Sequence, residues 1–286
     1  MPEPEEHWDL EIKPTGSLFD LKLKDVWHYR DLLLLLVRRD FVSFYKQTML
    51  GPIWFFVQPI ITILVYTLVF SNLAGIKTDG IPGPVFYLAG TIMWNYFSEC
   101  LTKTSTVFKD NAGMLGKVYF PRLIMPLSII FSNLIRFGVQ LILFIVLLAY
   151  YILAGKPIVP NVYLLLLPFL IILIAALGLG LGMIVSAVTT KYRDVSFVVS
   201  FGVPLLMYTT TVIYPLSEVV KKYSHYSWLI KFNPLTSIIE TFRYGFLGKG
   251  SFSWELLLYT SAFTIIVLLI GIVVFNKVEK TFVDTV

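Results

Sequence analysis

The sequence YKQTMLGPIWFFVQPIITILVYTLVF, residues 45–70, decides the fold of this chain. It begins with polar residues, breaks at Gly51 and Pro52, and then carries no charged residue as far as Asn72. The segment 53–72 spans about 20 residues, which at a rise of about 1.5 Å per residue match the ~30 Å hydrocarbon core of a bilayer. The stretch therefore marks the point where the chain enters a membrane.

The composition of the whole chain agrees with a membrane location. Of its 286 residues, 57% are hydrophobic and 14% are charged, whereas soluble domains carry about 25% charged residues. This composition is typical of an integral membrane protein and leaves no room for a second, soluble domain. We assign the net charge of +5 to connections that set topology and contact anionic lipids, not to nucleic-acid binding. Cys100 is the single cysteine, so an internal disulfide is excluded.

The apolar segments predict an all-α integral membrane protein with six transmembrane helices. An interfacial amphipathic helix precedes them, and an outer re-entrant helix lies between spans 5 and 6. The expected spans cover about residues 53–72, 85–106, 123–153, 162–188, 195–214 and 256–276. We interpret residues 25–286 as a single transmembrane domain that follows an exposed tail over residues 1–24.

The expected interfacial helix covers residues 25–47. It contains the apolar run Leu32–Val37, which is too short to cross a bilayer. Basic residues flank that run: Arg30, Arg38, Arg39 and Lys46. A helix of this kind lies in the plane of the membrane with its apolar side in the lipid. The alternative is a solvated helix that packs on a partner protein.

The distribution of basic residues predicts the orientation. They gather in the N-terminal segment, the connection 103–122, the turn 189–194 and the C-terminal tail. By the positive-inside rule both termini are cytoplasmic, and the connection 215–255 is outside. Within that connection Asn233 and Pro234 supply a helix N-cap and a first-turn proline, and apolar residues then recur at helical spacing. We expect this helix to enter the outer leaflet without crossing it.

The sequence contains no residue set typical of an intramembrane enzyme. Its three histidines, His7, His28 and His225, lie outside the expected spans, and HExxH and GxSxG motifs do not occur. A Walker A motif is also missing, so we expect neither cofactor nor metal in this chain and expect another polypeptide to bind any ATP. Gly178 and Gly182, four residues apart in an apolar span, favour close packing of two helices.

Two kinds of residue inside the expected spans are candidates for function. Glu99 and Arg136 are ionisable at a depth where charges are costly, although they could instead pair with one another, or Arg136 could extend toward the headgroups. Aromatic residues recur on one face of span 1 and one face of span 5: Phe55, Tyr66 and Phe70, and Phe197, Phe201 and Tyr208. These faces either contact lipid or line a conduit whose aromatic rings stack on sugar rings.

The chain also resembles a known family. The stretch FYKQTMLGPIWFFVQPIITILVYTLVF is similar to the entry segment of ABC-2 type permeases that export polysaccharides, namely O-antigen, capsule and teichoic acid exporters. The similarity continues through NAGMLGKVYFPRLIMP, through YRD at residues 192–194 and through NPLTSIIETFRYGFLG. It covers nearly the whole chain in order and points to the family rather than to one glycan.

The resemblance implies a transmembrane permease subunit that is not itself an enzyme. Such a subunit forms a homodimer in the bacterial inner membrane and works with two copies of a separate ATP-binding subunit, which binds ATP and Mg²⁺. The transported substrate is a lipid-linked polysaccharide of the O-antigen kind. Membrane lipids are the remaining partners, and nucleic acid is not among them.

The resemblance also implies roles for particular residues. Coupling to the ATPase involves two cytoplasmic segments, with Lys109, Asp110, Met114 and Lys117 in one and Tyr192, Arg193 and Asp194 in the other. The entrance for the glycan and its lipid headgroup involves Arg38, Arg39, Lys46 and Trp54. The outer gate involves Asn233, Pro234, Glu240 and Arg243.

Two other functions stay open from the sequence. One is an ABC-2 permease that exports a drug, a lipid or haem instead of a glycan. The other is a membrane enzyme of glycan assembly, which the missing catalytic residues disfavour. The aromatic faces and the basic entrance favour the glycan exporter.

Overall fold

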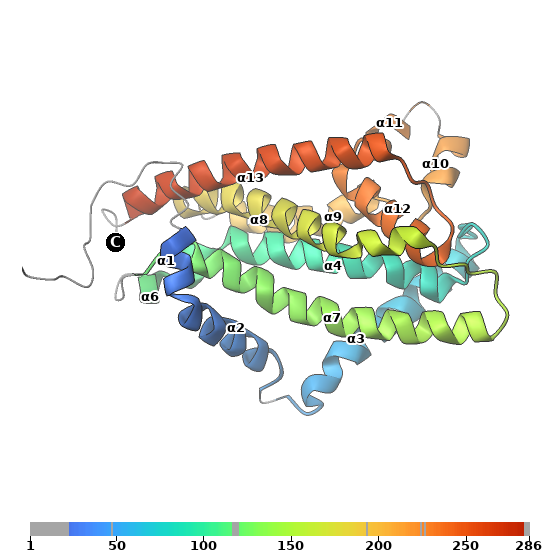
Figure 1. Ribbon diagram of the computed structural model, residues 1–286, viewed down its shortest axis with the longest axis horizontal. Helices are drawn as coiled ribbons and strands as arrows, with labels where there is room; N and C mark the ends of the chain where they lie inside the picture. The colour runs from blue at the N-terminus through green and yellow to red at the C-terminus, as the bar shows by residue number, and fades with distance from the viewer. Residues whose placement is uncertain are drawn as a thin grey trace, which may run out of the picture.

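The computed structural model describes residues 23–46, 48–115, 120–192, 194–223, 225 and 227–282. Every regular element in these residues is a helix. The long helices α4 (Gly83–Ser105), α7 (Ile124–Leu153), α8 (Leu167–Lys191) and α13 (Trp254–Phe282) run side by side (Figure 1). The predicted all-α class is therefore confirmed.

Four helical segments are long and apolar enough to cross a membrane: Gly51–Leu73, Ile124–Leu153, Val162–Lys191 and Trp254–Val278. The first is built from η1 (Gly51–Ile53), α3 (Trp54–Tyr66) and the π-helical η2 (Thr67–Leu73). The third joins η3 (Val162–Leu166) to α8. These segments match the expected spans 1, 3, 4 and 6, and α13 extends beyond the expected end at residue 276.

The other two expected spans differ from these four. Helix α4 has the length of a span, but polar residues on one of its faces keep it below the hydropathy of the others. Helix α9 (Val195–Leu206) continues only through η4 (Met207–Thr209), so it ends five residues before the expected end at residue 214. The backbone turns extended at Thr210, with φ −118° and ψ 165°. Span 5 was therefore predicted too long.

The N-terminal amphipathic segment forms two helices where the sequence predicted one. Helix α1 (Leu23–His28) and helix α2 (Arg30–Tyr45) are separated by Tyr29, whose φ of −90° and ψ of 22° interrupt the helix. Leu36 of α2 is 1% exposed and packs in a cluster with the start of α7, whereas Leu34 is 61% exposed. One apolar side of α2 therefore packs on protein, and the other remains available to lipid.

Close backbone packing places α8 between α4 and α13. Gly178 and Gly182 face α4, where an added Cβ would lie 3.0 Å from Cβ of Cys100 and 2.6 Å from Cβ of Thr104, respectively. Gly180, on the opposite side, faces Gly271 of α13. The predicted role of Gly178 and Gly182 in close helix packing is confirmed.

In its described residues, the connection between η4 and α13 contains the helices α10 (Leu216–Lys222), α11 (Ser227–Lys231) and α12 (Pro234–Leu247). The side chain of Asn233 caps α12 by accepting a hydrogen bond of 3.0 Å from the backbone N–H of Leu235. Gly248 ends it in the left-handed conformation, with φ of 66°. The predicted helix is confirmed, and it packs against α4, α13 and η3 at one end of the bundle (Figure 1).

The opposite end of the bundle carries two short helices after α4, namely α5 (Val107–Asp110) and α6 (Ala112–Leu115). Phe108 of α5 stacks on Phe275 of α13, with ring centroids 4.6 Å apart. Helices α1 and α2 lie at this same end (Figure 1). The short helices are thus held firmly on the bundle.

The substitution Gly182→Ala tests the packing of α8 on α4. Its Cβ would lie 2.6 Å from Cβ of Thr104, and overpacking of this kind costs about 1–3 kcal/mol. We expect a clearly lower melting temperature for the purified protein in detergent. Gly138→Ala on α7 is the matched control, because its Cβ meets nothing within 4 Å. Equal melting temperatures for the two variants would contradict the packing argument.

Candidate functional site

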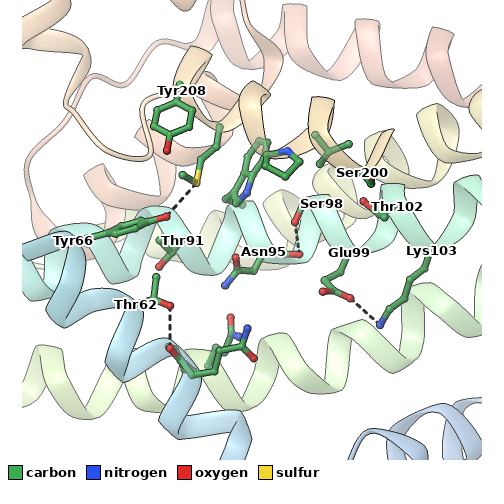
Figure 2. A pocket seen from close by; sticks show the side chains of 17 residues that line it. Thr62, Tyr66, Thr91, Asn95, Ser98, Glu99, Thr102, Lys103, Ser200 and Tyr208 are labelled. Carbon is green, nitrogen blue, oxygen red and sulfur yellow. Dashed lines mark hydrogen bonds and ion pairs between the residues drawn. The ribbon is translucent and has the colours of Figure 1, made fainter. Parts of the chain in front are cut away.

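A cleft of about 640 Å³ lies between α3, α4, α7 and the α9–η4 segment (Figure 2). It sits within the part of the protein formed by the long helices, at the depth of the expected spans. Most of its polar lining residues carry no charge, and three aromatic residues, Tyr66, Trp94 and Tyr208, join them. The cleft is therefore an open, largely uncharged polar cavity bordered by apolar helices.

Helix α4 supplies the main polar wall of the cleft. Thr91, Asn95, Ser98 and Thr102 recur at intervals of three or four residues and so lie on one helix face. Hydroxyl groups in this row donate to carbonyls of their own helix, as Thr91 does to Tyr87 at 2.9 Å. Each such hydroxyl keeps its lone pairs available to accept a hydrogen bond from a solute in the cleft.

Three amide side chains from different helices converge on the cleft. Gln58 comes from α3, Asn95 from α4 and Gln140 from α7. Their side-chain amides make no hydrogen bond to another described residue. Because an unsatisfied amide in an apolar medium costs several kcal/mol, these groups require water or a polar solute in the cleft.

The predicted aromatic residues fall in different places. Tyr66 and Tyr208 both line the cleft, and Tyr66 Oη lies 3.7 Å from Sδ of Met207 (Figure 2). Phe70 packs edge-on against Tyr66. Phe55 is buried and lines a smaller neighbouring cavity. Phe197 and Phe201 are 72% and 58% exposed and do not line the cleft.

A charged cluster occupies one end of the cleft. Oε2 of Glu99 lies 2.7 Å from Nζ of Lys103 and 3.5 Å from Nη1 of Arg136. Lys103 also donates to Oδ1 of Asn133 at 3.3 Å. Glu99 and Arg136 line the neighbouring cavity of about 100 Å³. The pairing of Glu99 with Arg136, left open by the sequence, is thus present, and Lys103 joins it.

Several residues of the cleft and of the neighbouring cavity were not among the sequence candidates. They are Lys103, Asn133, Gln58, Gln140 and the uncharged row on α4. A signal for the row exists in the sequence, because polar residues repeat at helical spacing within an otherwise apolar span. The sequence around Gln140 shows no such repeat of polar residues. Gln140 reaches the cleft because of how α7 packs on α4.

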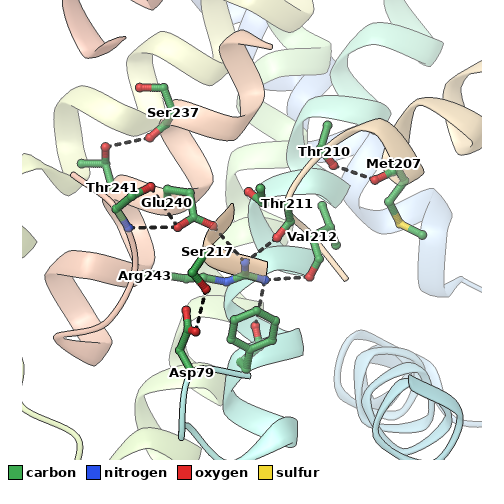
Figure 3. A network of polar contacts seen from close by, with 12 residues as sticks. Asp79, Met207, Thr210, Thr211, Val212, Ser217, Ser237, Glu240, Thr241 and Arg243 are labelled. Atoms are coloured by element: carbon green, nitrogen blue, oxygen red, sulfur yellow. Dashed lines mark hydrogen bonds and ion pairs between the residues drawn. The ribbon is translucent and has the colours of Figure 1, made fainter. Parts of the chain in front are cut away.

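Two of the gate candidates, Glu240 and Arg243, form a buried network on α12 (Figure 3). The Arg243 side chain is 1% exposed and lies 3.5 Å from Oε1 of Glu240. Its guanidinium donates to the carbonyl of Thr211, to that of Val212 at 2.6 Å and to that of Phe86 at 3.3 Å. In this buried site the guanidinium charge is met by one carboxylate and three backbone carbonyls.

This network joins three parts of the chain. Arg243 belongs to α12, Phe86 to α4, and Thr211 and Val212 to the segment that follows η4. Gly90 of α4 makes room for the guanidinium, because a Cβ there would lie 2.6 Å from Nη2 of Arg243. The carbonyls of Thr211 and Val212, which follow the end of η4, are bound by Arg243 and not by a further helical turn.

The remaining outer-gate candidates lie beside the network. Pro234 is the first residue of α12, and the side-chain amide of Asn233 donates to the carbonyl of Thr209 at 3.2 Å. Glu240 accepts a hydrogen bond of 3.1 Å from the backbone N–H of Ser251. Asn233, Glu240 and Arg243 therefore connect α12 to neighbouring segments, whereas Pro234 begins the helix.

The entrance candidates lie at the α2–α3 end of the chain. Arg38 and Arg39 are exposed on α2, and Arg39 pairs with Asp40 at 2.8 Å. Lys46 follows α2 and is exposed. Trp54 begins α3 and is 39% exposed. The structure leaves these residues at the surface and does not join them to the cleft.

The coupling candidates lie in two segments at the end of the bundle opposite α12. Lys109 and Asp110 are exposed on α5, and Met114 belongs to α6. Tyr192 is 52% exposed and Asp194 is exposed, while Lys117 and Arg193 lie outside the described residues. The two segments are tied together, because Thr189 Oγ1 donates to the carbonyl of Ser105 at 2.5 Å.

Metal binding finds no support in the described residues, where no three His, Cys, Asp or Glu side chains are grouped as a metal site. The chemistry of the cleft is instead that of hydrogen bonding, aromatic stacking and a single charged cluster. Such a lining can hold a polar solute without reacting with it.

Known proteins resemble this chain over most of its length. It is 28% identical to the O-antigen export system permease protein RfbA of Myxococcus xanthus, covering 92% of this chain and 98% of that protein. A protein of the same name from Klebsiella pneumoniae is 27% identical, covering 89% of this chain and 94% of its own. The polysialic acid transport protein KpsM of Escherichia coli is 24% identical, with coverages of 85% and 91%.

The family assignment rests on a separate comparison. The sequence profile of the ABC-2 type transporter family matches residues 31–247, which include α2 to α12 and therefore the cleft and the outer network. The matched part is well over half of the chain. This protein belongs to the ABC-2 type transporter family.

Proposed function

We propose that this chain is the permease subunit of an ATP-driven transporter that exports a lipid-linked polysaccharide of the O-antigen kind across the bacterial inner membrane. The family membership and the names of the relatives support a permease. Two of the relatives cited above carry O-antigen export in their names, and a third carries polysialic acid transport. A permease of this kind moves its substrate without changing it chemically.

The observation that carries the choice of substrate class is the lining of the cleft. Hydroxyl and amide groups on α3, α4 and α7 can exchange hydrogen bonds with sugar hydroxyls, since each such group both donates and accepts. Tyr66, Trp94 and Tyr208 supply aromatic rings, whose faces suit the C–H groups of a sugar ring. A drug or haem site is lined predominantly by hydrophobic side chains with few polar groups, whereas hydroxyl and amide side chains make up much of this lining.

The proposed topology has six spans, with α4 and the α9–η4 segment as the second and fifth. A polar α4 is tolerated in a membrane because other helices surround it and its polar face opens on the cleft. The 14 residues of α12 are too few to cross a bilayer, so we place it as a re-entrant helix in the outer leaflet. Both termini are then cytoplasmic, in keeping with the positive-inside rule.

A homodimer would complete the pathway. Only 17% of the most apolar window of the Gly51–Leu73 helix is buried within one chain. The exposed side of α9, with Phe197 and Phe201, lies beside the same cleft. A second copy set against α3 and α9 would turn an open cleft into an enclosed conduit, with α12 and its buried Arg243 as the outer gate. The entrance would lie at the basic end of α2.

Coupling to ATP would reach the cleft through α4. The short helix α5 follows α4 directly, so a push on Lys109 and Asp110 is transmitted to the helix that forms the polar wall. The family implies an ATP-binding partner subunit. We propose that two copies of this partner subunit bind ATP and Mg²⁺ and dock on α5, α6 and the 191–194 turn. Their movement on ATP binding would then move these segments, together with α4, as a rigid body.

Disruption of the gene tests the proposed function directly. We expect the mutant to accumulate a lipid-linked glycan on the cytoplasmic side of the inner membrane and to lose it from the cell surface. Extraction of lipid-linked saccharides and their analysis by mass spectrometry provide the measurement. Restoring the gene should restore surface glycan, whereas normal surface glycan in the mutant would refute the assignment.

The variant Tyr66→Ala combined with Tyr208→Ala tests the aromatic lining. Loss of two stacking rings, each worth about 0.5–1.5 kcal/mol, should slow glycan export several-fold while the protein remains folded. Pulse labelling of surface glycan measures the rate. Tyr150→Ala is the matched control, since Tyr150 is 64% exposed on α7 and away from the cleft. If Tyr150→Ala slows export as much as the double variant does, stacking on Tyr66 and Tyr208 does not contribute to transport.

The variant Thr189→Val tests the link between the two cytoplasmic segments. It removes the hydrogen bond to the carbonyl of Ser105, so we expect less glycan exported per ATP hydrolysed in the complex with the ATP-binding subunit. Thr190→Val is the matched control, because Thr190 bonds only within its own helix, to the carbonyl of Ser186 at 2.8 Å. If both variants export as much glycan per ATP hydrolysed as the wild type, the hydrogen bond does not couple the two segments.

A further inference from the structure

The neighbouring cavity is a small extension of the cleft. Its volume is about 100 Å³, against about 640 Å³ for the cleft. Gln58, Asn95, Glu99 and Gln140 line both spaces and therefore stand at their junction. Sites that hold a whole small ligand measure about 300–1,000 Å³. The neighbouring cavity therefore suits a substituent of a sugar that lies in the cleft, and not a whole sugar.

Three carboxamide side chains meet at this junction. Gln58 comes from α3, Asn95 from α4 and Gln140 from α7. Their amide groups make no hydrogen bond to another described residue. Each carboxamide carries N–H donors and a carbonyl acceptor. A group that passes from the cleft into the neighbouring cavity thus meets donors and acceptors from three helices.

Beyond the junction the lining is largely aromatic. Phe55, Tyr96 and Phe137 line the neighbouring cavity but not the cleft. Phe55 is 7% exposed, and Tyr96 and Phe137 are each 3% exposed. The rings of Tyr96 and Phe137 are in contact, with centroids 5.3 Å apart. These rings offer close van der Waals contacts to a small apolar group such as a methyl group.

The charged residues of the cavity hold two of its walls together. Oε2 of Glu99 on α4 lies 3.5 Å from Nη1 of Arg136 on α7. Lys103 of α4 donates a hydrogen bond of 3.3 Å to Oδ1 of Asn133 on α7. These contacts join the two helices that carry two of the three carboxamides, so they set the width of the junction.

From the cleft inward, the order of groups is carboxamides first and aromatic rings second. A substituent that matches this order has a polar part beside the sugar ring and an apolar end. A hydroxyl or hydroxymethyl group lacks the apolar end, and a methyl group lacks the polar part. We propose that the neighbouring cavity is a subsite for the acetamido group of an N-acetylated sugar. The inference rests on the proposed export function and names a feature of the exported glycan.

An acetamido group has one N–H donor, one carbonyl acceptor and a terminal methyl group. The carboxamides of Gln58, Asn95 and Gln140 can accept from the N–H and donate to the carbonyl. The methyl group then contacts the rings of Phe55 and Phe137. A sugar with a hydroxyl group in place of the acetamido group leaves the neighbouring cavity to water and makes fewer contacts.

Equilibrium binding to the complex with the ATP-binding subunit, in nanodiscs of zwitterionic lipid, tests the subsite. The probes are chitotetraose and cellotetraose, which share their linkage and differ in an acetamido or a hydroxyl group on each sugar. The variants are Gln58→Met and Gln140→Met, which keep the side-chain length and remove the amide. Asn72→Met is the matched control, since Asn72 is exposed on η2 and lines neither space.

We expect the wild-type complex to bind chitotetraose about tenfold more tightly than cellotetraose, the effect of about two additional hydrogen bonds. Each glutamine variant should lower this preference to about threefold or less, because one of these bonds is lost. Asn72→Met should keep the wild-type preference. The affinity for cellotetraose shows that each variant is folded, so misfolding cannot imitate a change in preference.

Equal binding of the two probes by the wild-type complex would overturn the subsite, as would a preference that both glutamine variants retain. Either result leaves the exporter proposal intact if gene disruption still causes a lipid-linked glycan to accumulate. If no glycan accumulates but the preference and its loss are observed, the acetamido subsite stands and the exporter proposal fails.

Sugar analysis of the accumulated glycan identifies the source of the acetamido group. N-acetylated sugars along the repeats would place the subsite in contact with the moving chain. Such a sugar at the lipid end alone would restrict the contact to the start or the end of export. A glycan without any N-acetylated sugar would overturn the subsite as a part of the transport pathway.

Discussion

Polar groups cannot face hydrocarbon without a cost of several kcal/mol each, and this constraint arranges the protein around α4. That helix carries a row of hydroxyl and amide side chains on one face. The glycine contacts of α8 cover its other side closely, with Gly182 against Thr104. The polar face of α4 is therefore left to open on the cleft, where α3, α7 and α9 shield it from lipid. The cleft exists because one face of a central helix cannot be buried in lipid.

The two ends of the bundle are built differently. At the end with α12, a fully buried Arg243 binds three backbone carbonyls from two other segments. Loss of such a residue would leave several buried groups unpaired, so these contacts stabilise the position of α12. At the opposite end, short helices and the 191–194 turn present exposed charged and aromatic residues. The end with α5 and α6 is therefore accessible to an ATP-binding partner subunit, whereas the end with α12 is held together by buried contacts.

Charge inside the cleft is concentrated at a single cluster. Along the remainder of the lining, hydroxyls, amides and aromatic rings offer many weak and similar contacts. A long, repetitive solute can move along such a surface because each step exchanges one contact for an equivalent one. The charged cluster with Lys103 differs from this uniform lining, because it places fixed charges at one point of the cleft. Both kinds of contact come from α4, which carries the uncharged polar row as well as Glu99 and Lys103.

The sequence alone determined the all-helical membrane class, the ends of most spans, the cap of α12 by Asn233 and the family, because these depend on hydropathy and on local backbone signals. Only the tertiary structure decided which side chains meet. It showed that Tyr66 and Tyr208 share a cleft that Phe197 and Phe201 do not line, and that Lys103 joins Glu99 and Arg136. Periodicity fixes the face of a helix on which a residue lies, whereas the neighbour of that face is set by how distant helices pack.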